Sequence, residues 1–307
     1  MILHEFKGYG SMKKTRNGKY LAIASKKIEV YDSTSFKKVA EFRNIRHPSS
    51  IAFSSDSRLM AVKNTSGLIN LYNLVEMSFI TSFQPSEREG SNILFTPDNE
   101  NILSSDWDGN IYRINIHSEK IETIRQYENF LLEKMDYDEQ KKRFYMIASQ
   151  KRSDKNMEPT DDYSILIEWQ YPFVESSLRE RKISYKTYDV KYNHVHDGYI
   201  AVHDSDLIAL NSDYKVIKTR RLKDTFGMTR LDWSADGKLI LLLNGSILEL
   251  IDYESFDVIN TFEFSTPLDA EFVIEDDCKT FSCGTFHKTY YIDLQKVEKS
   301  ENPIVIK

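Results

Sequence analysis

The sequence predicts an all-β fold, a seven-bladed β-propeller with four antiparallel strands in each blade. The main observation is a repeated phrase: an apolar run, a tight turn, and an alternating strand that closes on Asp or Asn. The closing residues of its six clear copies are Asp32, Asn73, Asn115, Asn211, Asp252 and Asp293. A broken seventh copy extends from Arg143 to Trp169. Neighbouring copies end 41 or 42 residues apart, except for the 54 residues between Asn115 and Trp169. Strand repeats with a period near forty are typical of propeller blades.

Within each blade the strands differ in their expected burial. Stretches such as SSIAFSSDSR and TRLDWSADGK precede the repeated phrase and predict the innermost strands. The run 239–243 is apolar at every position, which is typical of a strand covered on both faces. The run 247–251 alternates, so we expect it nearer the rim. Ser66-Gly67, Asp108-Gly109 and Asn244-Gly245 supply the positive φ that tight hairpins need between these strands.

Two segments leave alternatives open. The apolar spacing from Ile121 to Met135 also fits an amphipathic helix, whereas the repeat requires strands there. The outer strand of the last blade has two candidates, the N-terminal MILHEF and the C-terminal PIVIK. We expect MILHEF to take this position.

Composition limits the class of protein. A repeat that fills almost all of the 307 residues predicts a single domain over 1–307 with a loop insertion at 150–162. The net charge of −6 argues against a general nucleic-acid binder. The N-terminus has no apolar segment of signal-peptide length, and no stretch is long enough to span a membrane. We therefore expect a cytoplasmic protein without a membrane partner.

Two predicted turns of the repeat read Ser234-Ala235-Asp236-Gly237 and Asp106-Trp107-Asp108-Gly109. These turns are similar to the first and the second turn of a WD40 blade, and the chain resembles the WD40-repeat family over almost its entire length. The closing dipeptide is never Trp-Asp, and His47 belongs to a blade with Ser66 where the family has Asp. The resemblance implies a non-enzymatic protein-binding scaffold or adaptor that uses the face formed by the hairpin turns and blade connections, here called the top face.

Catalytic and cofactor patterns are absent from the sequence. It has neither paired histidines one helical turn apart nor a Gly-flanked hydrolase serine, and no phosphate-binding glycine pattern. His194, His196 and His203, with Asp197 and Asp204, are the only metal-like cluster, but the strand between them separates the histidines. We therefore predict no catalytic residue, metal or cofactor. The alternative is a propeller lactonase or hydrolase that acts on a small anionic substrate, and a third possibility is a structural subunit or an inhibitor of a toxin.

Two features predict a binding surface for a protein partner. The insertion QKRSDKNMEPTDD at 150–162 lengthens one hairpin on the top face, and surface loops often carry binding function. Basic residues also gather in the predicted blade connections and this loop. The predicted partner-binding residues are Arg43, Arg46, Arg88, Arg125, Lys151, Arg152, Arg179, Arg181, Arg220 and Arg221.

Overall fold

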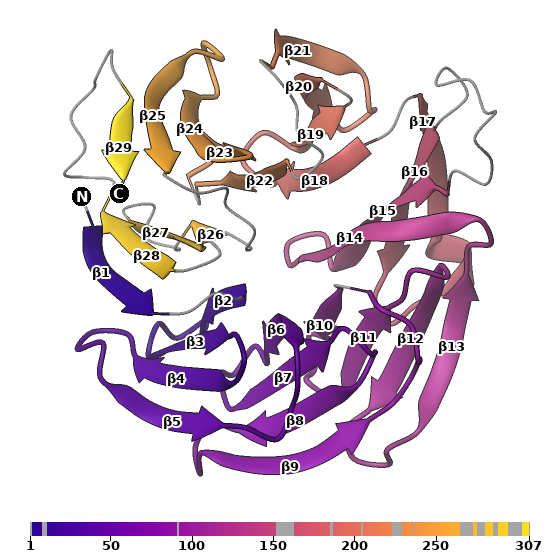
Figure 1. Ribbon diagram of the computed structural model, residues 1–307. Helices are drawn as coiled ribbons and strands as arrows, with labels where there is room; N and C mark the ends of the chain where they lie inside the picture. Colours follow the sequence, from indigo (N-terminus) through magenta and orange to yellow (C-terminus); the bar gives the residue numbers. More distant parts are fainter. Residues whose placement is uncertain are drawn as a thin grey trace. The chain divides into compact units, whose positions relative to one another are not determined.

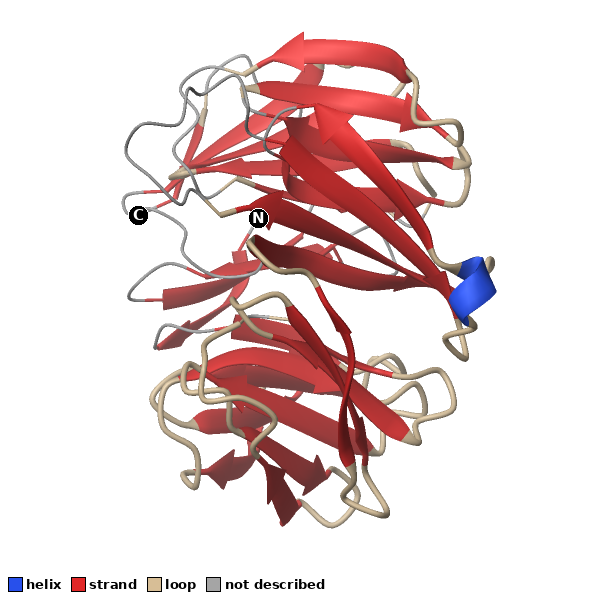
Figure 2. Cartoon of the chain, turned by 90° about the vertical axis from the view of Figure 1, so that its right-hand side faces the viewer, coloured by secondary structure: helices blue, strands red, loops and turns tan. Residues whose placement is uncertain are grey.

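The protein is described by a computed structural model that divides into two compact units. The description covers residues 2–7, 11–90, 92–151, 163–184, 187–203, 205–222, 229–234, 236–264, 273–274, 280–284, 288–293 and 303–306. The N-terminal unit is Gly10–Arg181, and the C-terminal unit combines Met1–Tyr9 with Lys182–Lys307. Strands dominate the described chain, and the only helical turn in it is η2 (Glu175–Ser177; Figure 2). No described helix has the length and apolar character needed to cross a membrane.

Four blades, each made of four consecutive strands, account for the N-terminal unit, although the last strand, β17, continues three residues beyond its boundary at Arg181 (Figure 1). The first two are β2 (Ser11–Lys14), β3 (Tyr20–Ala24), β4 (Ile28–Asp32) and β5 (Lys38–Phe42), then β6 (Pro48–Phe53), β7 (Leu59–Asn64), β8 (Ile69–Asn73) and β9 (Ser78–Phe83). The next two are β10 (Ile93–Phe95), β11 (Asn101–Ser105), β12 (Asn110–Asn115) and β13 (Ile121–Gln126), then β14 (Phe130–Asp138), β15 (Arg143–Gln150), β16 (Tyr163–Gln170) and β17 (Arg179–Ser184).

Three further sheets belong to the C-terminal unit. The first is β18 (Thr187–Asn193), β19 (Gly198–His203), β20 (Asp206–Asn211) and β21 (Val216–Arg221). The second is β22 (Arg230–Trp233), β23 (Leu239–Asn244), β24 (Ile247–Asp252), β25 (Val258–Phe264) and β29 (Ile304–Ile306). The third is β26 (Val273–Ile274), β27 (Thr280–Gly284), β28 (Lys288–Asp293) and β1 (Ile2–Lys7).

The fold is an all-β β-propeller with four-stranded blades, but the prediction of seven blades of four antiparallel strands is wrong. Among the described residues six blades have four strands, and the remaining sheet has five. Its fifth strand, β29, pairs parallel to β25. The physical reason is that Ile304 pairs with Phe262 of β25 and packs against the apolar cluster that contains Phe262 and Phe264. PIVIK therefore extends a blade that already has its four strands.

The structure resolves both alternatives that the sequence left open. Residues 121–126 form β13 and residues 130–138 form β14, so no helix occupies this segment. The N-terminal segment forms β1, which pairs antiparallel with β28 and is the outer strand of that sheet, as expected for MILHEF.

The repeated Asp or Asn has a local structural role. Its Oδ1 accepts backbone N–H groups of the turn that follows, for example from Ser35 to Asp32, from Val75 to Asn73 and from Ser118 to Asn115, each at 2.8 Å. Such side-chain acceptors stabilise tight turns. The turns end in residues with left-handed φ between 50° and 63°, namely Phe36, Met77, Glu119, Tyr214 and Phe256. The closing residue thus marks the turn into each outer strand.

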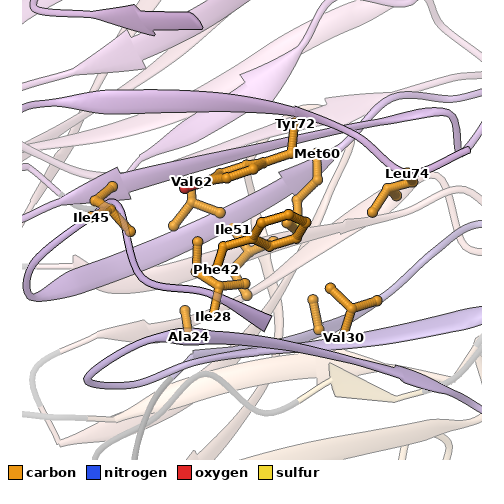
Figure 3. Close-up of a cluster of buried hydrophobic side chains, with 11 residues drawn as sticks. Ala24, Ile28, Val30, Phe42, Ile45, Ile51, Met60, Val62, Tyr72 and Leu74 are labelled. Carbon is orange, nitrogen blue, oxygen red and sulfur yellow. The ribbon is translucent and has the colours of Figure 1, made fainter. Parts of the chain in front are cut away.

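Apolar side chains fill the space between neighbouring blades. In the cluster of Figure 3, Ala24 and Val30 of one blade face Ile51, Val62 and Tyr72 of the next, and all are buried. Burial of a Val or Ile side chain stabilises the fold by roughly 1.5–3 kcal/mol relative to full exposure. This packing holds the strand ends, and the turns that they carry, in fixed positions.

Candidate functional site

The hairpin turn between β11 and β12 is organised by a buried carboxylate, Asp106. Asp106 is 1% exposed. Oδ1 accepts the backbone N–H groups of Asp108 and Asn110, each at 3.0 Å. Oδ2 accepts the hydroxyls of Ser86 and Tyr112, each at 2.8 Å. Burial alone raises the pKa of Asp106, but the hydrogen bonds, those from Asn110 foremost, outweigh it and hold the pKa below its ordinary value.

A buried cation lies next to this turn. Lys63 on β7 is 1% exposed, and its Nζ donates to the Ser104 hydroxyl at 2.9 Å and to the Ser105 carbonyl oxygen. Burial lowers the pKa of Lys63 to about 8, although the negative charges of Asp106 and Glu89 oppose that shift. Lys63 therefore joins two neighbouring blades directly beneath the turn.

The backbone of this turn needs glycine. Gly109 has φ of +84°, and a Cβ there would lie 2.1 Å from the Tyr127 carbonyl oxygen. The Tyr127 N–H in turn donates to the Gly109 carbonyl oxygen at 2.9 Å. The hairpin turn and the connection after β13 are therefore packed backbone to backbone, which leaves the turn little freedom.

The same turn presents a large aromatic side chain to solvent. Trp107 is 47% exposed, while its backbone N–H donates to the Glu89 carbonyl oxygen at 2.7 Å. Its neighbour Asp108 pairs with Arg88 at 3.3 Å and with Lys151 at 3.2 Å. We call Arg88, Trp107, Asp108 and Lys151 the Trp107 surface. Trp and Arg are enriched in protein interfaces, whereas Asp and Lys are depleted there, so Trp107 and Arg88 are the interface-like residues of this surface.

The structure distributes the predicted basic residues differently from the sequence prediction. Arg88 and Lys151 do lie together, through Asp108. Arg46 is exposed in the connection before β6, and Arg152 lies outside the described residues. The predicted placement in blade connections is wrong for those that belong to the outer strands β13, β17 and β21, namely Arg125, Arg179, Arg181, Arg220 and Arg221. The reason is that these strands continue further than the sequence pattern indicates.

Acidic neighbours also neutralise much of the predicted basic character. Arg43 pairs with Glu41 at 2.5 Å, and Arg125 pairs with Glu180 at 2.9 Å. In the C-terminal unit, Arg220 pairs with Glu249 and Arg221 pairs with Asp206, each at 3.4 Å. These local pairs reduce the net positive charge that a partner meets.

The histidine cluster is not brought together. His194 and His196 lie in the turn before β19, and His203 lies at the end of that strand. The centroid of the His196 ring lies 4.0 Å from that of Tyr253 with the two rings tilted, and its Nε2 is 3.0 Å from the Gly237 carbonyl oxygen. In the part of the chain that the structure describes, no three His, Cys, Asp or Glu residues are placed to hold a metal ion.

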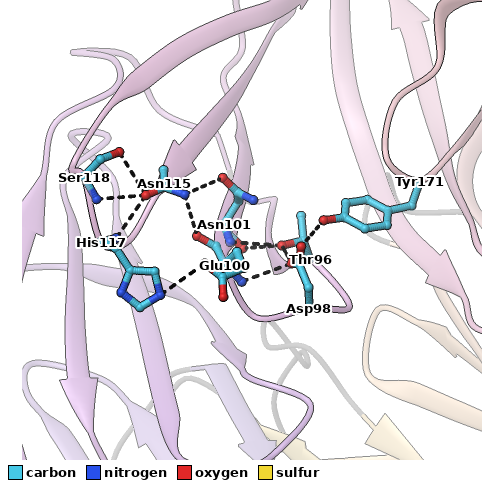
Figure 4. A network of polar contacts seen from close by, with 8 residues as sticks. All are labelled: Thr96, Asp98, Glu100, Asn101, Asn115, His117, Ser118 and Tyr171. Atoms are coloured by element: carbon cyan, nitrogen blue, oxygen red, sulfur yellow. Dashed lines mark hydrogen bonds and ion pairs between the residues drawn. The ribbon is translucent and has the colours of Figure 1, made fainter.

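A second polar network lies at the opposite ends of β11 and β12 (Figure 4). Asp98 accepts the Thr96 hydroxyl at 2.6 Å and also the Tyr171 hydroxyl from the next blade. His117 pairs with Glu100 at 3.3 Å on the surface. Burial, with the Asp98 carboxylate, raises the pKa of Tyr171 to about 12. These contacts close turns and link blades.

Comparison with known proteins supports the fold and goes no further. The search of solved structures finds hydrazine synthase of Kuenenia stuttgartiensis, with a TM-score of 0.73 and 11% identity. The match covers 93% of this chain and 95% of that chain. No family model matches the chain, and no curated protein matches it. The β-propeller fold is thus shown, and WD40 membership stays a prediction.

Sequence reasoning missed two residues of this site. Trp107 was assigned to a structural hairpin turn, which it occupies, but its exposure was not foreseen. Lys63 is the one charged residue in the run LMAVKN of a strand covered on both faces. A lysine in such a run is the signal that could have indicated a buried cation.

Proposed function

We propose that this chain is a protein-binding scaffold or adaptor and that the Trp107 surface is the centre of its recognition site. The observation that carries the proposal is the exposed indole of Trp107, held on a turn that Asp106 and Gly109 fix. Tryptophan and arginine are the residues most enriched among those that dominate binding energy. A rigid aromatic side chain also loses little conformational entropy when a partner covers it.

The charges around Trp107 indicate the kind of partner. Arg88 is 73% exposed and Asp108 is 50% exposed, so both can exchange their mutual contact for contacts to a partner. A partner with an apolar pocket for the indole and charged groups of both signs at its rim fits this surface. The predicted loop at 150–162 begins beside it, since Lys151 pairs with Asp108. Residues 152–162 of the predicted loop lie outside the described residues, and their part in binding stays a prediction.

The test is quantitative affinity capture from a lysate of the source organism, followed by titration calorimetry with the purified partner. Trp107→Ala should weaken binding by about 30-fold or more, the loss expected for a residue that dominates binding energy. Phe79→Ala is the matched control, because Phe79 is 46% exposed on the outer strand β9. Both variants should keep the wild-type melting temperature.

A partner that binds Trp107→Ala and wild type equally would refute the Trp107 surface as the recognition site. Equal losses for Trp107→Ala and Phe79→Ala would also refute it, because they would indicate a general surface effect. Arg88→Ala should reduce the association rate more than it increases the dissociation rate, since an exposed charge mainly steers encounter.

A further inference from the structure

Strand β9 is the outer strand of its blade, and its composition differs from that of the other outer strands (Figure 1). Its sequence, SFITSF, has no charged residue. The outer strands β1, β5, β13, β17 and β21 each have at least two, as in KVAEF of β5 and VIKTRR of β21. β25 has one charged residue, Glu263, and is partly covered by β29. Charged side chains on outer strands oppose pairing with other chains, and β9 lacks this protection.

The apolar side chains of β9 are accessible to solvent. Phe79 and Ile80 are each 46% exposed, and Ser82 is also exposed. Val75, in the turn before β9, is 67% exposed. In the described part of the chain, β8 is the only strand that pairs with β9. An outer strand that is exposed, apolar and uncharged is prone to pair with another strand.

A β-bulge at Ile80 limits the length of this edge. The register with β8 shifts between Phe79 and Thr81, so Ile80 has no residue opposite it. β21 has the same irregularity at Ile217, which is 51% exposed. The bulge therefore does not distinguish β9 from the other outer strands, whereas the lack of charge does. Because a bulge shortens the regular part of an edge, we expect pairing at β9 to be weak and dependent on concentration.

We propose that β9 is a self-association site, at which the β9 strands of two copies of the chain pair antiparallel across a two-fold axis. Two-fold dimers are the commonest oligomers, and their interface is self-complementary. Near the axis each residue faces its own counterpart or a close neighbour, so like charges there would repel. The uncharged β9 avoids this repulsion. A self-pair of β21 would instead bring together Lys218, Arg220 and Arg221 of both copies.

Two observations favour a second copy over a different protein. A partner of different sequence is normally selected by complementary charge, and β9 has no charge to be recognised. The chain also already covers its other weakly charged outer strand with a strand of its own, since Ile304 of β29 pairs with Phe262 of β25. An apolar segment of this same sequence is therefore a suitable occupant for such an edge.

The carboxylates beside β9 give the dimer a characteristic dependence on salt. The Ser78 hydroxyl lies 3.4 Å from Oε2 of Glu76, and the Thr81 hydroxyl lies 3.2 Å from Oε1 of Glu119. In a two-fold dimer these carboxylates of both copies have the same sign and repel. Because salt screens repulsion between exposed charges, association should strengthen as the salt concentration rises. An interface held by ion pairs would show the opposite trend.

The test is sedimentation velocity of the full chain over a range of protein concentrations, at low and at high salt. Wild type should show a monomer–dimer equilibrium that shifts towards the dimer at high salt. Ile80→Lys places two lysines near the axis and should weaken the dimer by about tenfold or more. Ile217→Lys is the matched control, because Ile217 has the same bulge position in β21 and a similar exposure, and it should associate as wild type does. Both variants should keep the melting temperature of monomeric wild type.

The self-association site and the Trp107 surface are tested separately. Trp107→Ala should leave dimerisation unchanged, because Trp107 lies on the hairpin turn between β11 and β12 of another blade. Ile80→Lys should leave partner capture unchanged. The capture control Phe79→Ala is therefore measured at a protein concentration at which the chain is monomeric. Failure of one site then does not imply failure of the other.

Hydrogen exchange of wild type gives a second readout that needs no substitution. The amides of β9 should exchange more slowly as the protein concentration rises, whereas those of β5 and β21 should not change. A chain that stays monomeric, a dimer that Ile80→Lys and Ile217→Lys weaken equally, or exchange in β9 that is independent of concentration would overturn the proposal. Capture of a different protein that Ile80→Lys abolishes, while wild type stays monomeric, would assign β9 to that partner and would overturn the proposal as well.

Discussion

Replacing Lys63 by methionine should change how the stability of the fold depends on pH. Burial lowers the pKa of Lys63 from 10.5 to about 8 in the folded protein, whereas the unfolded chain restores the ordinary value. One pKa unit corresponds to 1.36 kcal/mol, so the charged form of Lys63 destabilises the fold by about 3 kcal/mol at neutral pH. The Ser104 and Ser105 oxygens that accept from Nζ are uncharged, and they offset only part of the cost of burial.

The sign of the pH dependence follows from proton uptake. Between about pH 8 and about pH 10.5 the unfolded chain binds more protons at Lys63 than the folded chain does, so the free energy of unfolding rises with pH. Below about pH 8 both states are protonated, and this stabilising contribution is absent. We expect the free energy of unfolding of wild type, minus that of Lys63→Met, to rise by about 3 kcal/mol across this window.

The assay is urea denaturation of both proteins at several pH values, followed by far-ultraviolet circular dichroism. Taking the difference between the proteins removes the tyrosines, among them Tyr72, whose pKa is raised to about 12 by burial and which titrate in the same range. Loss of the hydrogen bonds to Ser104 and Ser105 adds an offset that does not vary with pH. Lys37→Met is the matched control, because Lys37 is exposed. A difference between wild type and Lys63→Met that stays flat would refute the burial of an ionisable amine at this position.

Three further perturbations test the core, the sheet edge and the turn. Leu241→Ala should lower the free energy of unfolding by about 2–5 kcal/mol, since Leu241 is 1% exposed, whereas Val216→Ala, at 57% exposed, should change it by less than about 0.5 kcal/mol. Deletion of β1 removes the buried Phe6 and leaves the edge of β28 unpaired, so the melting temperature should fall and size-exclusion chromatography should show association. Asp106→Ala leaves the Ser86 and Tyr112 hydroxyls without their acceptor and should cost about 1–3 kcal/mol in urea denaturation. If the deletion of β1 or Asp106→Ala left the melting temperature equal to that of wild type, the corresponding prediction would be contradicted.

The turns and strands could be predicted because their determinants are local. Asp32 and Asn73 accept hydrogen bonds from residues two or three positions later, so the sequence itself carries the whole interaction. The position of β29 could not be predicted in the same way. Ile304–Ile306 has the composition of a strand, but its partner depends on which sheet edge remains open, and that edge is more than forty residues earlier in the chain.

The candidate site was only partly predictable for a similar reason. Arg88 and Lys151 were predicted to share one face, and they meet through Asp108, which the sequence places on the same face as a turn residue. Arg220 and Arg221 were placed in a connection, but β21 continues through both, because a strand end depends on pairing with β20 that the local pattern does not define.

The buried polar groups explain why the exposed indole can serve as a rigid anchor. A turn that protrudes from a sheet is normally mobile, and a mobile anchor loses affinity through the entropy of ordering on binding. At this turn Asp106 holds the backbone from within, while Glu89 binds the Trp107 N–H from the adjacent connection. Lys63, on the preceding blade, places a positive charge near Asp106 and donates a hydrogen bond to Ser104 of the same blade as Asp106. The turn is therefore already ordered in the folded chain before a partner binds. Binding at Trp107 requires little further loss of conformational entropy.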